Sequence, residues 1–245
     1  MFRTLAVRAG RILNWTWHYR RLQADCELLR LPVPAERVLA TEIGLVAPVE
    51  ATVKVIVTRG AGGRGYAIMP TRATRIVAAF PLPQYDPAAA QDGVRVRRCA
   101  LVLSEQPRLA GAKTLNRLEN VLARSEWDDP GIAEGLLGDA GGHVIEGTMS
   151  NLFVVKGGRA ATPALSRCGV LGAQRERVRV LLARDKVPCE ERDLRWSELE
   201  AADEAFLTNS LIGVWPVARL DARQWTPGTT TRRVQALVAE ADAAA

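Results

Sequence analysis

A stretch rich in chain-breaking residues constrains the fold of this sequence more than any other feature. The segment from Phe80 to Pro87 contains three prolines, and the alanines that follow it show little periodicity. Proline lacks a backbone donor and fixes φ, so such a stretch continues neither a helix nor a central strand. The 245-residue chain, 48% hydrophobic, is long enough to form two modest cores. We therefore expect two lobes, over residues 1–84 and 85–245.

The first lobe is expected to combine helices with an antiparallel sheet. Apolar residues recur at helical spacing up to Leu29, in a helix that Asn14 or Thr16 can cap, and a second helix is predicted over residues 34–43. The run over residues 51–58 alternates valine with other residues, which is typical of a half-buried strand. These elements predict an α+β unit.

The second lobe is expected to contain most of the strands. Its predicted elements are strand 94–103, strands 144–145 and 152–155, helix 173–182, strand 205–208, a strand around Val214 and helix 234–239. Asn116 with Glu119, and Ser197 with Glu200, form capping patterns that predict two more helix starts. The core-facing side of the first of these helices is expected to consist of Leu118, Val121 and Leu122.

Charge and cysteine content exclude several classes of function. The formal net charge is +6, but arginines are scattered among Asp and Glu, which argues against nucleic-acid binding and suits a small anionic substrate. Four cysteines without paired spacing and only two histidines predict no metal site. No run approaches the roughly 18 apolar residues of a membrane span. We expect a cytoplasmic protein with reduced thiols and no membrane partner.

Lys113 is the first candidate for chemistry. It lies among apolar neighbours just before a predicted helix, and only three other lysines occur in this arginine-rich chain. Burial disfavours the ammonium form, and a neutral amine can form a Schiff base with a carbonyl group. The alternative is a surface lysine whose stem covers apolar neighbours.

Glu146 is the second candidate, at the end of the apolar run Val144-Ile145. A buried carboxylate is costly without a cationic or hydrogen-bonding partner, so Glu146 is expected to have one. The alternative is an exposed glutamate that begins a turn.

Four stretches together resemble one family, the fold-type IV pyridoxal-phosphate enzymes, which includes branched-chain and D-amino-acid aminotransferases and aminodeoxychorismate lyase. They are Arg59–Tyr66, Leu109–Arg124, Val144–Phe153 and Phe206–Val217, and they follow one another along the chain in the same order as in the family. Leu-Ala-Gly-Ala-Lys-Thr-Leu-Asn-Arg-Leu-Glu looks most like the lyase branch. The resemblance implies a two-lobed α+β fold, with a small α/β lobe and a larger β-barrel-like lobe that carries helices and the cofactor lysine, and it implies a homodimer.

The resemblance also implies the cofactor, pyridoxal 5'-phosphate, and its contacts. Lys113 matches the lysine that forms the Schiff base and then moves the proton on the amine-bearing carbon. Glu146 matches the glutamate that faces the pyridine nitrogen. The phosphate is expected to bind Arg21 of His18-Tyr-Arg-Arg-Leu22, the amides at the helix start, and a polar turn. The helix start is at Ala173 and Gln174, and the polar turn consists of Thr208, Asn209 and Ser210. Gln174 departs from the usual Ile-Thr pair.

The glycine-rich segment at residues 60–65 lacks the Gly-Lys-Ser/Thr ending of a nucleotide-binding loop and joins extended runs. In the lyase-like branch this stretch lies near the substrate, so Arg64 and Tyr66 are expected to contact it, with Arg64 on a carboxylate. The alternative is a hairpin with a surface arginine.

The resemblance has one gap, at the N-terminus. Family members begin with a strand and an Asp-Arg-Gly leader before the Phe-x-Thr that here is Phe2-Arg-Thr4, and Arg3 stands where glutamate is frequent. Either the start is assigned too far downstream or a strand of the first lobe is missing.

The resemblance favours a lyase that converts 4-amino-4-deoxychorismate to 4-aminobenzoate and pyruvate in folate biosynthesis. The second hypothesis is an aminotransferase of branched-chain or D-amino acids, which shares every cofactor contact. The third is a pyridoxal-phosphate-binding scaffold that is inactive through N-terminal truncation. In each active case the substrate is a small anionic amine.

Overall fold

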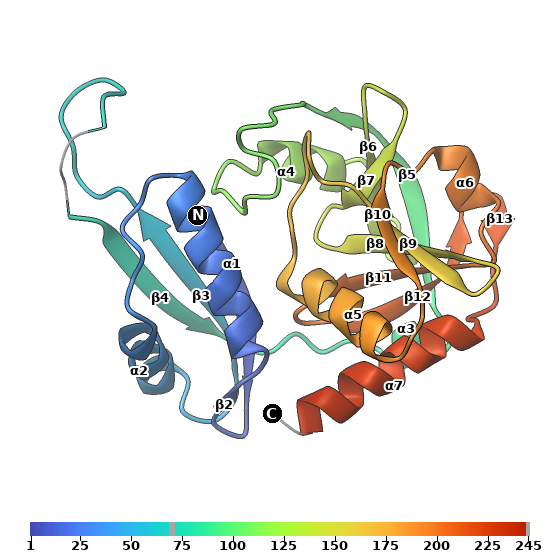
Figure 1. Cartoon of the computed structure of the whole chain (residues 1–245), viewed down its shortest axis with the longest axis horizontal. Helices are drawn as coiled ribbons and strands as arrows, with labels where there is room; N and C mark the ends of the chain where they lie inside the picture. The colour runs from blue at the N-terminus through green and yellow to red at the C-terminus, as the bar shows by residue number, and fades with distance from the viewer. Residues whose placement is uncertain (69–71, 244–245) are drawn as a thin grey trace. The chain divides into compact units, whose positions relative to one another are not determined.

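The computed structural model describes residues 1–68 and 72–243, drawn in colour in Figure 1. The last two residues of the expected second lobe lie outside the described residues. The chain forms two compact units, one of Met1–Pro83 with Ala112–Leu115 and one of Gln84–Gly111 with Asn116–Ala245. The sequence assigned Lys113 to the second lobe, whereas its segment belongs to the first unit. The Lys113 amide donates to the Asp25 side chain and its carbonyl accepts from the Phe2 amide, and these two contacts attach the segment to the first unit.

The first unit is a four-stranded antiparallel sheet with two helices. Its elements are β1 (Phe2–Arg8), β2 (Arg11–Ile12), α1 (Trp15–Leu28), α2 (Glu36–Val46), β3 (Ala51–Thr58) and β4 (Thr74–Phe80), and the strand order is β2-β1-β3-β4. Residues Val53, Val55 and Val57 of β3 are buried, as the alternation predicts. They share one core with Leu22 of α1 and Leu39 of α2.

Helix α1 carries Arg21, one of the predicted site residues. The helix begins after Asn14, which has a φ of 57°, and the chain leaves it before Pro32. Its buried side is formed by His18, Leu22, Asp25 and Cys26. A histidine and an aspartate therefore lie on the face that packs on the sheet.

The second unit is built on a nine-stranded mixed sheet that curls into a half-barrel (Figure 1). The order is β10-β9-β8-β11-β12-β5-β6-β7, with β13 paired to β12. The strands are β5 (Val94–Leu103), β6 (Ile132–Asp139), β7 (Val144–Gly147), β8 (Asn151–Lys156), β9 (Arg159–Pro163), β10 (Cys189–Arg192), β11 (Glu204–Asn209), β12 (Gly213–Leu220) and β13 (Arg223–Gln224). The sheet of parallel and antiparallel pairs confirms the expected fold class of a two-lobed α+β protein with a barrel-like larger lobe.

The helices of this unit are α3 (Ala88–Gln91), α4 (Leu118–Arg124), α5 (Ala173–Arg184), α6 (Trp196–Glu200) and α7 (Thr229–Ala243). Helices α5 and α7 share a core with the strands β8 and β11, in which the rings of Phe153 and Phe206 stack at 4.9 Å. That packing fixes where α5 starts relative to the ends of β8 and β11.

Two helix predictions were wrong in detail. Residues Leu118, Val121 and Leu122 of α4 do not face the core but are 69%, 60% and 59% exposed. The helix is only seven residues long and packs through Ala123, while Glu119 accepts a hydrogen bond from the Ser104 amide at 2.8 Å. A short helix can bury a small side chain and leave its larger apolar side chains outside.

The capping box of α6 also lies elsewhere than predicted. Glu198, rather than Glu200, accepts a hydrogen bond from the backbone amide of Arg195 at 2.9 Å. Burial of Trp196 and Leu199 in the main core of this unit draws the helix start toward residue 196.

Within the described part of the chain, no helix is both long and apolar enough to cross a membrane. Over the same residues, His, Cys, Asp and Glu form no group of three or more that could hold a metal ion.

Candidate active site

The lysine singled out by the sequence has its backbone fixed on both sides within the first unit. The Lys113 amide donates to Oδ2 of Asp25 at 3.2 Å, and the Lys113 carbonyl accepts from the Phe2 amide at 2.9 Å. The Lys113 Nζ lies 4.8 Å from the centre of the Phe2 ring, within the range of a cation–π contact. Helix α1 and strand β1 thus hold a half-buried lysine against an aromatic face.

Arg21 belongs to the same unit and lies one turn before Asp25 on α1. Its guanidinium contacts Oδ1 of Asp25 at 3.4 Å, and Arg3 forms an ion pair with Oδ2 of that carboxylate and donates to the Arg21 carbonyl at 3.3 Å. Burial lowers the pKa of Arg3 to about 10 despite the attraction of Asp25. Asp25 was not among the residues predicted from the sequence. Its signal was a charged residue on the apolar face of a helix, next to Cys26.

His18 is buried beside this cluster. It is 2% exposed, and neither ring nitrogen has a hydrogen-bond partner among residues 1–68 and 72–243. Burial lowers the pKa of His18 to about 3, and the charges of Arg3 and Lys113 act in the same direction. The imidazole is therefore neutral at physiological pH.

Glu146 lies at the end of β7 in the second unit and is 3% exposed. The alternative of an exposed turn glutamate is therefore wrong. Its Oε2 accepts from the Val170 amide at 2.9 Å and from Asn151 Nδ2 at 3.3 Å. Asn151 Nδ2 also donates to the Val170 carbonyl at 2.8 Å. A short polar bridge thus joins Glu146 to the loop that precedes α5.

That loop approaches its neighbours closely because of two glycines. Gly169 has a φ of +84°, and a Cβ there would lie 2.9 Å from Ile145 and 3.5 Å from the Glu146 carboxyl carbon. A Cβ on Gly172 would collide with Oδ1 of Asn151. Gly172 is also the N-cap of α5 and provides no side-chain cap for the helix start, where amides lack intrahelical acceptors.

Ala173 and Gln174, the first residues of α5, are 3% and 2% exposed. The polar turn after β11 lies near them through the sheet, because Thr208 pairs with Asn151 across β11 and β8. The Thr208 hydroxyl is buried, and within the described residues its Oγ1 has no hydrogen-bond partner. A buried hydroxyl without a hydrogen-bond partner is unusual, and a bound ligand that accepts or donates a hydrogen bond would satisfy it.

The two residues after Thr208 differ in how their side chains are used. Asn209 Oδ1 accepts from the amides of Leu211 and Ile212 at 2.8 and 2.9 Å, and its Nδ2 donates to the Met149 carbonyl at 3.1 Å. The Asn209 side chain therefore builds the turn and ties it to residues 147–150. Ser210 is half-buried in the same turn.

Glu134 in β6 is a further buried residue that was not predicted from the sequence. Its carboxylate accepts five hydrogen bonds, two from the side chains of Thr148 and Ser150 and three from backbone amides, namely those of Gly135, Thr148 and Met149. Burial raises the pKa of Glu134, and these bonds oppose that effect. Glu134 thus fixes the turn between Glu146 and Asn151, and its signal was an acidic residue inside an apolar strand.

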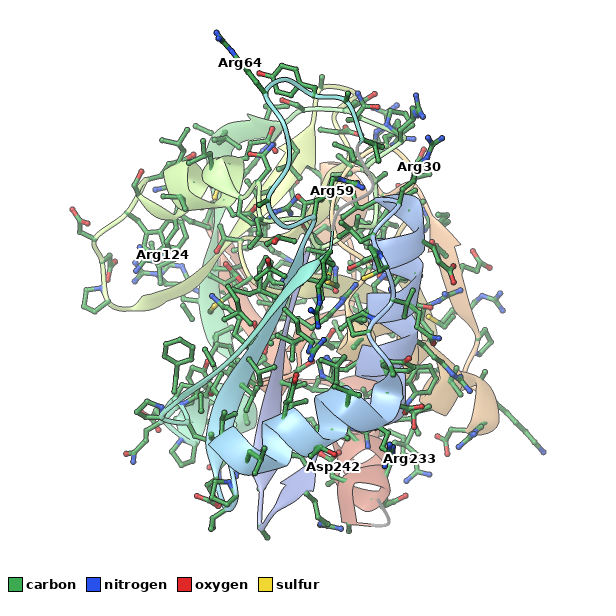
Figure 2. The ribbon with its side chains drawn as sticks, turned by 90° about the vertical axis from the view of Figure 1, so that its left-hand side faces the viewer. Arg30, Arg59, Arg64, Arg124, Arg233 and Asp242 are labelled. Atoms are coloured by element: carbon green, nitrogen blue, oxygen red, sulfur yellow. The ribbon has the colours of Figure 1, made fainter. Side chains whose placement is uncertain are left out.

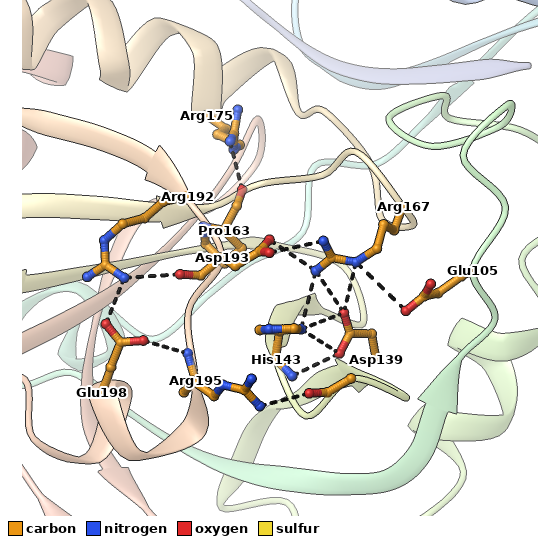
Figure 3. Close-up of polar contacts among 11 residues, drawn as sticks. Glu105, Asp139, His143, Pro163, Arg167, Arg175, Arg192, Asp193, Arg195 and Glu198 are labelled. Carbon is orange, nitrogen blue, oxygen red and sulfur yellow. Dashed lines mark hydrogen bonds and ion pairs between the residues drawn. The ribbon is translucent and has the colours of Figure 1, made fainter.

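An ion-pair network anchors the other end of the loop before α5 (Figure 3). Arg167 lies 3.0 Å from both Asp139 and Asp193, and Asp139 also bonds the His143 ring at 3.0 Å. Hydrogen bonding to Arg167 lowers the pKa of Asp193. The Arg167 carbonyl accepts from the Gln106 amide at 2.8 Å. The loop is thus held on both sides of Gly169.

Arg64 and Tyr66 lie on the loop between β3 and β4 of the first unit. Both are exposed, and Figure 2 shows Arg64 pointing outward from the tip of the loop. Arg59 at the base of the same loop turns back and donates to the carbonyls of Leu29 and Arg30 at 2.5 and 2.9 Å. The structure therefore places the two predicted substrate residues on an outer loop anchored by Arg59.

Each unit therefore gathers part of the predicted set. The first holds Lys113 and Arg21 around Asp25, and the second gathers Glu146, the start of α5 and the Thr208–Ser210 turn around Asn151.

Comparison with known proteins gives consistent matches. The model of the amino-transferase class IV family matches residues 1–220. A curated aminodeoxychorismate lyase of Vibrio harveyi is 34% identical over 241 residues, covering 96% of this chain and 89% of that protein. The crystal structure of 4-amino-4-deoxychorismate lyase from Pseudomonas aeruginosa is 43% identical with a TM-score of 0.93, and the match covers 98% of this chain and 90% of that chain.

A third match shows the same fold at lower identity. The crystal structure of the branched-chain aminotransferase from Thermoproteus uzoniensis with norvaline is 22% identical with a TM-score of 0.86, covering 98% of this chain and 84% of that chain. The family match and the whole-length relatives leave one conclusion, which is that the chain belongs to the class IV amino-transferase family.

Proposed function

We propose that this protein is a pyridoxal-phosphate-dependent lyase that converts 4-amino-4-deoxychorismate to 4-aminobenzoate and pyruvate. The observation that carries the proposal is the buried arrangement of Glu146, Asn151 and the start of α5 beside the unsatisfied Thr208 hydroxyl. The two lyase relatives, at 34% and 43% identity, support this substrate over others.

The residues present fit the cofactor. Helix starts and buried hydroxyls are typical phosphate donors, so we assign the phosphate to the amides of Ala173 and Gln174, to Thr208 and Ser210, and to Arg21. Asn209 contributes by shaping the turn, because its side chain is already bonded. We assign the pyridine nitrogen to Glu146. When bound, the cofactor supplies an aldehyde that takes up amines and a ring that accepts electrons.

Lys113 has two tasks in this proposal. With the cofactor bound, its Nζ would hold the aldehyde, and it would take the proton from the amine-bearing carbon of the substrate. Its backbone, fixed by Phe2 and Asp25, keeps the amine close to that carbon. The carbon–oxygen bond between the substrate ring and its enolpyruvyl group breaks, and the substrate ring becomes aromatic. The released enolpyruvate takes up a proton to give pyruvate.

The substrate is a small anionic amine, and Arg64 and Tyr66 are proposed to contact it. We also propose a homodimer in the cytoplasm. The exposed apolar residues of α4 support the dimer, since a short row of leucine and valine at 59% to 69% exposure is unusual for a monomer surface. All four cysteines are free thiols, which fits a reducing compartment.

The second candidate is an aminotransferase, favoured by relatives such as a branched-chain-amino-acid aminotransferase of Pseudomonas aeruginosa, 26% identical over 215 residues. One experiment separates the candidates. The protein, loaded with pyridoxal 5'-phosphate, is incubated with aminodeoxychorismate and no 2-oxo acid, and pyruvate is measured over many turnovers. A lyase continues to release pyruvate, whereas an aminotransferase releases none, because it leaves the enolpyruvyl ether intact and stops after about one turnover per site without an amino-group acceptor.

Substitution of the lysine tests the cofactor assignment. Lys113→Ala is expected to lose the visible absorption of the bound cofactor and about 10³-fold or more in turnover, because the variant lacks the amine that forms the Schiff base. Lys156→Ala, at an exposed lysine, is the matched control and is expected to keep both. A wild-type protein that binds the cofactor and yields no product would instead support the inactive scaffold.

A further inference from the structure

Asp25 stands at the centre of the first unit's polar cluster. Its side chain is 1% exposed and lies on α1, one turn after Arg21. Its two oxygens receive different partners. Oδ1 faces the Arg21 guanidinium at 3.4 Å, and Oδ2 takes the Lys113 amide at 3.2 Å together with Arg3.

The contact with Lys113 is long-range, since 88 residues separate it from Asp25. It restrains the backbone of the lysine and not its amine. The Phe2 amide restrains the same residue from the other side, through the Lys113 carbonyl at 2.9 Å. A residue held at both its amide and its carbonyl has little freedom in φ and ψ, so the origin of its side chain is fixed.

Arg3 completes the cluster. A buried carboxylate is costly unless it is paired, and the side chain of Arg3, only 3% exposed, supplies the charge that pairs with Asp25. Arg3 also donates to the Arg21 carbonyl at 3.3 Å. The ion pair thus joins strand β1 to helix α1 at the turn that carries both Arg21 and Asp25.

We propose that Asp25 is a positioning residue, a single carboxylate that fixes the Lys113 peptide and the Arg21 guanidinium relative to each other, with Arg3 as its counter-ion. The proposal rests on the proposed function, in which Lys113 carries the cofactor and Arg21 holds its phosphate. Those two attachments belong to one small molecule. A shared carboxylate sets the distance between them and so the angle at which the amine meets the substrate carbon.

The test replaces the pair by apolar residues. The variant Arg3→Met/Asp25→Leu removes both charges together, so no unpaired charge stays buried, and such replacements often preserve stability. It also removes the acceptor of the Lys113 amide and the contact to Arg21. We expect hydrogen exchange of the Lys113 amide to accelerate roughly tenfold or more, and kcat to fall by a similar factor, with a small change in melting temperature.

A second variant covers the case in which the first fails to fold. Arg3→Met/Asp25→Asn keeps one acceptor oxygen for the Lys113 amide, removes the charge opposite Arg21 and leaves no unpaired Arg3 charge buried. We expect amide exchange near the wild-type rate and roughly tenfold weaker cofactor binding, measured by fluorescence titration. Leu39→Ala is the structural control, because this core residue of α2 is fully buried and its truncation destabilises the unit.

The proposal is overturned if Arg3→Met/Asp25→Leu keeps the wild-type exchange rate of the Lys113 amide and the wild-type kcat. It is also overturned if Leu39→Ala changes both to the same degree, because the effect would then be general destabilisation. Amide exchange is measured without substrate. If the wild type binds no cofactor, the proposed function fails. The restraint that Asp25 places on the Lys113 peptide is then tested by hydrogen exchange of the Lys113 amide alone.

Discussion

Several buried ionisable side chains among the described residues are either paired or held neutral. Arg3 and Asp25 form a buried ion pair, while His18 is kept neutral by its burial and by the neighbouring cations. The thiol of Cys99 is also neutral, because burial raises its pKa to about 12. Glu134 stands apart, since neutral donors surround its carboxylate. These residues make stability, and not only activity, sensitive to single substitutions.

The burial of His18 predicts in which direction the free energy of unfolding changes with pH. Its folded pKa of about 3 lies below the unfolded value, so the unfolded chain binds the extra proton as the pH falls below the ordinary value. Its contribution to stability is complete at pH 7 and is lost on acidification, by at most about 1.4 kcal/mol per pH unit below roughly pH 6.5. The free energy of unfolding in urea should therefore fall less steeply below pH 6 in His18→Asn than in the wild type.

Nuclear magnetic resonance checks the same point directly. The His143→Asn variant leaves one histidine, whose ring signals should keep the neutral pattern between pH 7 and about pH 4.5. A ring that titrates near pH 6.5 would contradict the assignment of a neutral His18.

Glu134→Gln is expected to destabilise the protein by about 1–3 kcal/mol. Both oxygens of Glu134 accept hydrogen bonds. In glutamine an NH2 group replaces one of these oxygens, so a donor would face donors where an acceptor is needed. Urea denaturation measures the loss, and Glu200→Gln at an exposed helix residue is the control. A loss as small as that of the control would mean that the turn at 147–150 does not depend on this carboxylate.

Among the elements, helix α4 differs most from its neighbours. Helices α5 and α7 place their leucines and valines in a shared core, whereas α4 leaves three large apolar side chains exposed. Apolar spacing alone predicted that these residues face inward. The spacing defines which residues share one side of a helix, but the packing partner decides whether that side lies inside the chain.

If α4 contributes to a dimer, Leu118→Gln/Leu122→Gln should weaken association without unfolding the chain. Both residues are more than half exposed, so their replacement costs the isolated chain little. Sedimentation equilibrium should show a shift toward monomer, while Leu45→Gln on the exposed side of α2 should leave the dimer intact. An unchanged dimer in the double variant would assign the interface to another surface.

Most elements could be predicted from periodicity and turn residues, and strand β5 was predicted with its observed bounds. The candidate residues Lys113 and Glu146 could be found from local sequence, because each is an ionisable residue in an apolar stretch. Asp25 and Glu134 could not be assigned a task in the same way. Their partners lie 88 residues and up to 16 residues away, and only the folded chain shows those contacts.

For the whole molecule, cofactor binding should couple to stability. A ligand that binds only the folded chain stabilises it by about 2.7 kcal/mol at 100 times its dissociation constant. The melting temperature should therefore rise with the concentration of pyridoxal 5'-phosphate. Pyridoxine, which has neither aldehyde nor phosphate, is the control and should have little effect.

The path of the chain between the units has a consequence for synthesis on the ribosome. Residues 112–115 belong to the first unit, although the strand β5 of the second unit precedes them. A nascent chain that ends at Pro83 has already made α1, but it still lacks the peptide that binds Asp25 and Phe2. The N-terminal unit therefore cannot finish folding before translation has passed residue 115, because four of its residues are synthesised after strand β5 of the second unit.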